Sequence, residues 1–256
     1  MLYYLMYALG FTVTLAWNLL IRKRYSFDVK ASILITVLTF LAGVFGALMM
    51  GKARDAIFGR DIINGEERSS VVCLFGALIF IPVFMAVVFK ILKIDINTGL
   101  DYITFGTLCV LAYSKLGCHF DGCCYGIESD FLVVYNEEVG ANVFAVQLFE
   151  SACLFLILII VELIVNFYPR YVRGTAYPIG AALYCVQRFF WEFMRNQEGS
   201  TTSDVLFGLT FWQLLCIVVF IASIAWLAVL CVKNKKITAD REDLPRQEEE
   251  ISGDAL

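Results

Sequence analysis

The segment SKLGCHFDGCCYG, residues 114–126, gathers the chain's only histidine and three of its nine cysteines. Thiols and imidazoles are zinc ligands, and the candidates here are Cys118, His119, Cys123 and Cys124. Their spacing argues against a metal, because no C-x-x-C pair is present. A redox role for the adjacent cysteines would require a strained ring. We therefore predict a structural cluster of small thiols among glycines that permit tight turns, with the metal and redox interpretations as alternatives.

A second group of reactive side chains lies in an apolar stretch near residue 190. Arg188, Glu192 and Arg195 are spaced at i, i+4 and i+7, so one helix face would present all three. Charges inside a membrane are costly and are functional by default. An arginine fork pairs well with phosphate oxygens, which favours a phosphate-binding role. The alternative is an interfacial ion pair whose long side chains reach the headgroups.

Gln147 and Glu150 open the apolar stretch before that one. Three positions apart, they share a helix face and can hydrogen-bond a polar headgroup. An acidic residue at a helix start also complements the helix dipole, so the local sequence leaves both interpretations open.

The elements that must position these groups are membrane spans. The chain is 60% hydrophobic and 17% charged, whereas soluble domains are closer to half apolar and a quarter charged. Several apolar runs approach the ~20 residues that cross a bilayer as helix. We predict an all-α polytopic membrane protein with about seven transmembrane helices, at 4–21, 31–50, 71–89, 98–113, 144–167, 175–195 and 205–232.

The two ends of the chain differ in character. The first span has no cationic segment before it and no cleavage site, so we expect it to be retained. Residues 1–232 form the predicted transmembrane domain, and residues 233–256 a disordered, charged cytoplasmic tail. Loop 51–70 is long enough to carry a small extracytoplasmic helix or arm. The net charge of −4 comes largely from the tail, and no basic stripe indicates a nucleic-acid partner.

Lysine and arginine predict the orientation, because cytoplasmic loops carry the excess of these residues. With the N-terminus outside and the C-terminus cytoplasmic, thirteen of the 20 would lie inside and seven outside. This topology places the cysteine segment and the Arg188–Arg195 group near the same, outer leaflet.

Taken in order, these segments resemble the bacterial prolipoprotein diacylglyceryl transferases, which have seven spans and an external N-terminus. Their signature contains a glycine–arginine, two asparagines, a glutamate and a closing glycine. The glycines match in register here, ending at Gly126, and divergent members share a GCCYG variant. Lys115 stands at the arginine, Cys118 and Asp121 at the asparagines, and Cys123 at the glutamate.

Further segments resemble the family in the same order. They are YYLMYALGF (3–11), FGAL (75–78), QLFES (147–151), GTAYPIGAALYCVQRFFWEFMR (174–195) and LTFWQLLC (209–216). Phe75 stands where the family commonly has a histidine, and Trp212 replaces a glycine. The resemblance covers most of residues 1–232.

The resemblance implies transfer of the diacylglyceryl group of phosphatidylglycerol to the lipobox cysteine of a prolipoprotein signal peptide, releasing glycerol 1-phosphate. It implies no metal or organic cofactor, lateral entry of membrane lipid, and an active site facing the outer leaflet of a bacterial plasma membrane. Arg188 and Lys115 would stabilise the phosphate leaving group, with Glu192 orienting the arginine. His119 is a candidate base, because Phe75 cannot accept a proton. Substrate-binding residues would be Arg195, Gln147, Glu150, Tyr3, Gly76, Cys118, Asp121 and Gly126.

Two other functions stay open from sequence. The substitutions in the signature favour, as one alternative, a divergent lipid transferase with another acceptor. The second is a membrane thiol redox or metal-binding protein that uses the Cys118, His119, Cys123 and Cys124 cluster.

Overall fold

A computed structural model describes residues 2–253 apart from 64, 65, 69–71, 138, 169 and 199, with side chains other than those of 62–68 and 236–253. The described part contains seven α-helices: α1 (Leu2–Ile21), α2 (Val29–Phe58), α3 (Leu74–Ile91), α4 (Ile96–Phe120), α5 (Val146–Phe167), α6 (Ala176–Trp191) and α7 (Phe211–Gly253). Short 3-10 turns, η1 (Arg22–Tyr25) and η2 (Glu192–Met194), follow α1 and α6. Two antiparallel hairpins pair β1 (Asp61–Ile63) with β2 (Glu66–Arg68) and β3 (Val133–Asn136) with β4 (Ala141–Phe144).

Five of these helices are long and apolar enough to cross a membrane. They are α1 continued through η1 (Leu2–Tyr25), α2, α3, α5 and the first part of α7 (Phe211–Lys235). The other two coincide with predicted spans but are less apolar or shorter, α4 carrying Asp101 and Lys115 and α6 having 16 residues. The membrane-protein class therefore agrees with the structure, whereas the count of seven spans and the orientation of the termini stay predictions.

Helix α4 is the centre of the bundle. It packs against α1, α3, α5 and α6, and most of its residues are buried. Its polar groups bond to neighbouring helices: the Asp101 carboxylate accepts the backbone N–H groups of Gly174 (2.8 Å) and Ala176 (3.2 Å). These bonds anchor the start of α6 on α4, because the first N–H groups of a helix lack partners within it.

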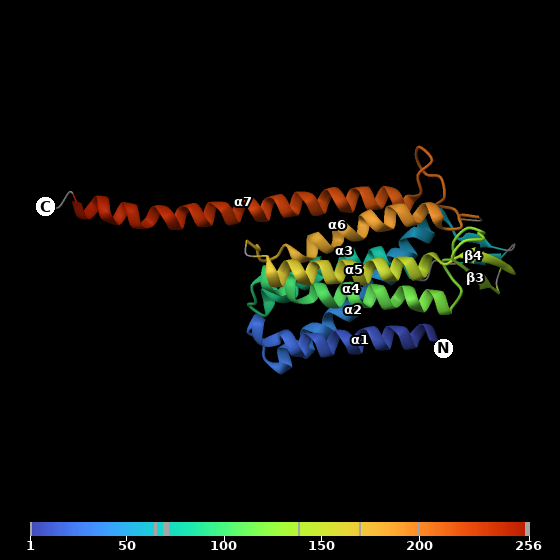
Figure 1. The fold of residues 1–256 in the computed structure, drawn as a ribbon, viewed down its shortest axis with the longest axis horizontal. Coiled ribbons are helices and arrows are strands. Elements are labelled where there is room, and N and C mark those ends of the chain that lie inside the picture. Colours follow the sequence, from blue (N-terminus) through green and yellow to red (C-terminus); the bar gives the residue numbers. More distant parts are fainter. Residues whose placement is uncertain are drawn as a thin grey trace.

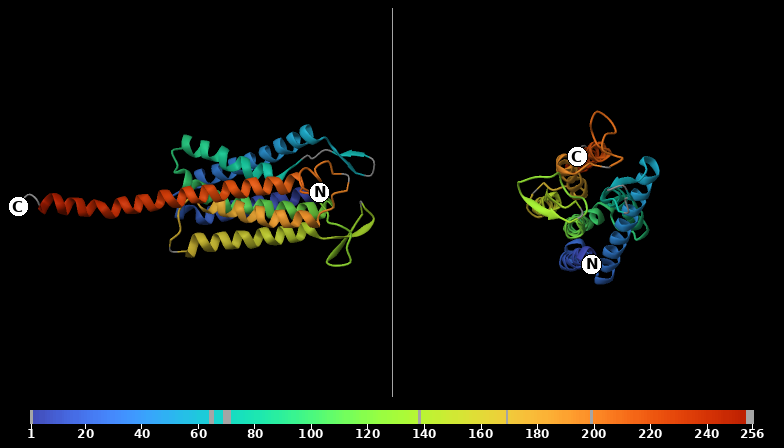
Figure 2. Two further views of the ribbon diagram at one scale, coloured as in Figure 1. Left: turned by 90° about the horizontal axis from the view of Figure 1, so that it is seen from above. Right: turned by 90° about the vertical axis from the view of Figure 1, so that its right-hand side faces the viewer.

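The bundle is elongated, and its two ends differ (Figure 1). Both hairpins and the start of α1 lie at one end, which we call the hairpin end. Helix α7 runs past the opposite end, as two perpendicular views show (Figure 2). Residues 233–256 were predicted to be disordered, but the backbone of α7 stays helical through Gly253. The boundary between a transmembrane domain (1–232) and a tail (233–256) stays a prediction.

Two other helix ends differ from the sequence prediction. Helix α2 continues to Phe58, beyond the predicted end at residue 50, and the β1–β2 hairpin follows it as the arm of loop 51–70. Helix α6 ends at Trp191, and Arg195 has extended backbone. Arg195 is therefore not on the continuous helix face predicted for it.

Candidate active site

The site begins where α4 ends in the cysteine segment. Cys118 lies in the last turn of α4, and Gly122 (φ +71°) and Cys124 (φ +59°) adopt left-handed backbone. This reverses the chain and returns Cys123 and Cys124 to the helix end. The reversal is held by the amide of Gln147, which donates to the Cys123 carbonyl at 2.8 Å. Left-handed backbone is unfavourable at a non-glycine residue, so the surrounding contacts must hold Cys124 in place.

The next residues join this loop to the end of α6. Gly126 forms a β-bridge with Arg195, and the Ile127 N–H donates to the Met194 carbonyl at 3.0 Å. A Cβ at Gly126 would lie 2.8 Å from that same Met194 oxygen, so only glycine fits there. The pairing explains why the chain leaves the helix before Arg195. It brings residues 115–126 and 188–195, which are distant in sequence, to one place.

Five charged side chains form a continuous ionic network at this place. Glu150 lies at its centre, with Lys115 Nζ at 2.5 Å and Arg188 Nη1 at 3.1 Å from its two oxygens. Arg188 Nη2 lies 2.6 Å from Glu192 Oε2, and Arg195 Nη1 lies 3.8 Å from the same oxygen. Lys115, Glu150, Arg188 and Glu192 are all at least 95% buried. Three cations face two carboxylates, so the network retains an excess positive charge for an anion.

Helix α7 supports Glu192 from the other side. Thr210 and Gln213 bond each other reciprocally at the start of α7, a T-x-x-Q capping box. The Thr210 hydroxyl also donates to Glu192 Oε1 at 3.2 Å, and the Gln197 amide donates to that oxygen at 3.1 Å. Glu192 is therefore fixed on one oxygen by hydrogen bonds and presents the other to the arginines.

A polar cavity of about 250 Å³ opens beside the network. Six of the sequence-predicted site residues line it, namely Tyr3, Lys115, Cys118, Arg188, Glu192 and Arg195. The other six do not line it: His119, Gly76, Asp121, Gly126, Gln147 and Glu150. Glu150 pairs with Lys115 and Arg188, which do line the cavity, while Gln147 and Gly126 hold the loop.

Three predicted residues thus have surroundings that differ from the expectation. Gly76 packs against the backbone of Gly46, where a side chain on either glycine would collide, so it permits close approach of α2 and α3. Asp121 is exposed at the end of α4. His119 is half-buried, with its ring 5.5 Å from that of Phe120, on a different side of the helix from the neighbouring Cys118.

The thiols of Cys118, Cys123 and Cys124 converge at the edge of the polar cavity. Their sulfur atoms all lie within 4.8 Å of one another. Hydrogen bonds from Cys118 and Cys123 hold the pKa of the Cys124 thiol well below its usual range. The spacing of the cysteines along the sequence argues against a metal, but the chain reversal at Gly122 brings these thiols closer together than the spacing indicates.

Sequence reasoning missed a second buried ion pair at this cavity. Arg54, near the end of α2, is 2% exposed and pairs with Asp55 and Asp61. Asp61 in turn accepts the backbone N–H of Thr201 at 2.9 Å. This hydrogen bond joins the β1–β2 arm, which follows α2, to the loop before α7. The sequence predicts a loop at 51–70, which includes residue 54, and only the apolar and alanine residues that continue through Phe58 indicate the longer helix.

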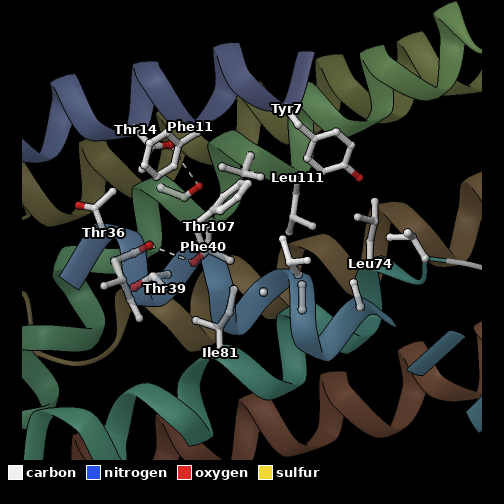
Figure 3. Close-up of a pocket in the computed structure, with 18 of the residues that line it drawn as sticks. Tyr7, Phe11, Thr14, Thr36, Thr39, Phe40, Leu74, Ile81, Thr107 and Leu111 are labelled. Atoms are coloured by element: carbon white, nitrogen blue, oxygen red, sulfur yellow. Dashed lines mark hydrogen bonds between the residues drawn. The ribbon is translucent and has the colours of Figure 1, made fainter. Parts of the chain in front are cut away.

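A second, apolar cavity of about 290 Å³ lies among α1, α2, α3 and α4 (Figure 3). Phe11, Phe40, Ile81 and Leu111 are among the side chains that line it. Its wall includes four residues that also line the polar cavity: Tyr3, Tyr7, Val72 and Leu74. The hydroxyls of Tyr3 and Tyr7 lie 3.3 Å apart. A charged cavity and an apolar cavity are therefore neighbours with a common wall.

The fold and the site define a class of helical membrane-type bundles with a buried cationic site beside an apolar cavity. Within that class, the family model of prolipoprotein diacylglyceryl transferase matches residues 1–229, and the chain belongs to this family. Membership makes it a transferase of lipoprotein biosynthesis, and the family transfers diacylglyceryl groups to prolipoproteins. A comparison with curated proteins gave no match.

Proposed function

We propose that the protein transfers the diacylglyceryl group of phosphatidylglycerol to the lipobox cysteine of a prolipoprotein signal peptide. The observation that carries the proposal is the common wall of Tyr3, Tyr7, Val72 and Leu74 between the two cavities. A phospholipid has a charged head and apolar chains joined at one glycerol. Its reacting carbon lies between these parts, which fits the boundary between a cationic and an apolar cavity.

The phosphate of the lipid would lie against Arg188, Lys115 and Arg195. Negative charge develops on the phosphate oxygen as the glyceryl C–O bond breaks, and buried cations stabilise that charge more strongly than cations in water. Glu150 and Glu192 hold these cations in place before the lipid arrives. The arrangement is therefore organised in advance for the transition state, with Arg188 central because it pairs with both carboxylates.

An acyl chain would occupy the apolar cavity. Tyr4, Val44 and Leu48 line this cavity and are also exposed on the outer surface of the bundle. The cavity thus reaches the surface between α1 and α2, where membrane lipid would lie. This supports lateral entry of the donor lipid.

We further propose that the hairpin end faces outward from a bacterial plasma membrane. The positive-inside count favours this orientation, and the start of α1 and the end of α7 lie at opposite ends of the molecule (Figure 1). Single cysteines introduced at Ser129 and Thr238 test it with a membrane-impermeant thiol reagent. Labelling of position 129 in intact cells is expected, and labelling of position 238 alone would contradict the orientation.

The activity is tested with purified protein, labelled phosphatidylglycerol and a lipobox peptide. We expect glycerol phosphate and a thioether-linked diacylglyceryl peptide in equal amounts. Arg188→Ala should lower the formation of both products by about 100–1,000-fold. Arg170→Ala, at an exposed arginine in the α5–α6 connection, should retain them. Equal release of glycerol phosphate with a serine-substituted peptide would show hydrolysis of the lipid between its glyceryl and phosphate groups and contradict the transferase proposal.

A further inference from the structure

The cysteine cluster at the edge of the polar cavity has no role in the proposed function. Thiols that merely fill space can face any direction, but Cys118, Cys123 and Cys124 place their sulfurs within 4.8 Å of one another. Holding them there requires left-handed backbone at Cys124, a conformation that is unfavourable outside glycine. Strained backbone of this kind concentrates at functional sites. The cluster also lies at the carboxyl end of α4, where the helix dipole favours a cation.

We propose that Cys118, Cys123 and Cys124 bind one zinc ion, whose fourth position takes the thiol of the acceptor peptide. Zinc takes thiolates at about 2.3 Å, which puts the sulfurs of a tetrahedral site roughly 3.8 Å apart. The present separations need only a small contraction to reach this. Three protein ligands and one open position are the pattern of a reactive zinc site, since structural sites use four protein ligands.

The open position faces the reacting groups. Cys118 and Cys124 line the polar cavity together with Lys115, Arg188 and Arg195, so a ligand entering from the cavity would meet the ion on that side. Lys115 and Arg195 are close enough to act electrostatically on Cys124, and their charge would offset the negative charge of a zinc trithiolate. The metal and the phosphate-binding cations therefore share one cavity.

The inference rests on the proposed function and supplies its missing step. Binding to zinc removes the proton of the acceptor thiol, which passes to water. The thiolate sulfur then attacks the glyceryl carbon of the lipid, an S–C bond forms, and the C–O bond to phosphate breaks. Glycerol phosphate leaves with the electron pair beside Arg188. The neutral thioether is a weak zinc ligand and can leave the ion. No base is then needed at position 75, where this chain has a phenylalanine and the family commonly has a histidine.

The first test measures the metal directly in the full-length protein purified in detergent. We expect one zinc per chain, with three sulfur neighbours by X-ray absorption. Cys118→Ser should lose the metal, whereas Cys231→Ser, an exposed cysteine of α7, should keep it. Less than stoichiometric zinc in the unmodified protein, or equal zinc in both variants, would overturn the proposal. The measurement on the unmodified protein stands even if Cys118→Ser fails to fold.

The second test replaces zinc with cobalt and follows the sulfur-to-cobalt absorption band. A lipobox peptide should increase this band by adding a fourth sulfur, and a serine-substituted peptide should not. Removing the metal should slow transfer about tenfold or more at pH 7, because only a few per cent of a free cysteine thiol is then ionised. An unchanged band on adding the lipobox peptide would overturn the thiol-delivery step.

Failure of the two proposals is distinguishable. If the cobalt band responds to the thiol peptide but no transfer is measured in any form, the metal site stands and the proposed function fails. If metal-free protein transfers at the rate of the unmodified protein, the function stands and the zinc proposal is overturned.

Discussion

The two cavities share a wall, yet they are built in opposite ways. The polar cavity is made by side chains from distant segments, with Glu150 of α5 joining Lys115 of α4 to Arg188 of α6. The apolar cavity is lined mainly by side chains of α1, α2, α3 and α4, and no charged residue of the described part lines it. Several of its wall residues are threonines, but Thr36, Thr39 and Thr107 donate their hydroxyls to the carbonyl four residues earlier and leave their methyl groups to the cavity.

The two cavities therefore differ in the free energy that the folded protein must spend to form them. Burying five charges requires mutual pairing, since an unpaired charge in such a site is strongly destabilising. The apolar cavity requires only that the side chains around it leave a space of suitable shape, with no pairing of charges. We therefore expect substitutions in the polar cavity to act on the chemical step and on folding, and substitutions in the apolar cavity to act on the binding of lipid.

The largest effect is expected at Arg188. Arg188→Ala should lower the rate of transfer by about 100–1,000-fold, because the phosphate loses a preorganised donor. Arg188→Lys should recover little of this, since a point charge cannot replace the guanidinium fork. Release of glycerol phosphate by equal amounts of folded variant measures both. Near-normal release by Arg188→Ala would show that the network is structural only.

Glu150→Gln should primarily damage folding. It leaves Lys115 and Arg188 buried side by side without their shared anion, and breaking such a pair costs about 3–5 kcal/mol. For a chain of this size we expect a midpoint of thermal unfolding at least roughly 6–12 °C lower. Glu128→Gln, at an exposed carboxylate, is the matched control. Equal midpoints for the two variants would contradict the central role of Glu150.

A smaller effect is expected in the apolar cavity. Val44 is 39% exposed and lines that cavity, so Val44→Trp should narrow its mouth. Displacing about two methylenes of an acyl chain should raise the KM for long-chain phosphatidylglycerol about tenfold and leave kcat nearly unchanged. Val83→Trp, on the exposed face of α3, should do neither. A fall in kcat without a change in KM would show that the cavity does not hold lipid.

The smallest effect is expected at His119. The imidazole lies beside Phe120 and does not line the polar cavity among the described residues. His119→Phe should therefore retain turnover within about twofold across the pH range, since general-base catalysis is typically worth at least ~100-fold. A fall in turnover of about 100-fold, with the acidic limb of the pH profile removed, would restore the sequence-based hypothesis that His119 is the base.

Sequence reasoning reached the helices and the charged residues, because apolar runs and the i, i+4 spacing of Arg188 and Glu192 are local patterns. The sequence did not predict which residues these charged side chains pair with. Glu150 pairs with residues 35 and 38 positions away, and nothing in its own neighbourhood indicates this. The convergence of the thiols depends on left-handed backbone at Cys124, for which a cysteine gives no signal. The T-x-x-Q pattern of Thr210 and Gln213 is visible in the sequence, and it would have predicted the start of α7.

The most direct test of the two-cavity account is a phosphatidylglycerol that carries a photoreactive group in one acyl chain. After irradiation in membranes, mass spectrometry identifies the labelled residues. The account predicts labels concentrated on the walls of the apolar cavity, at positions such as Phe11, Phe40 and Val44. Equal labelling of the exposed face of α7, at residues such as Val218 and Ile221, would contradict the account.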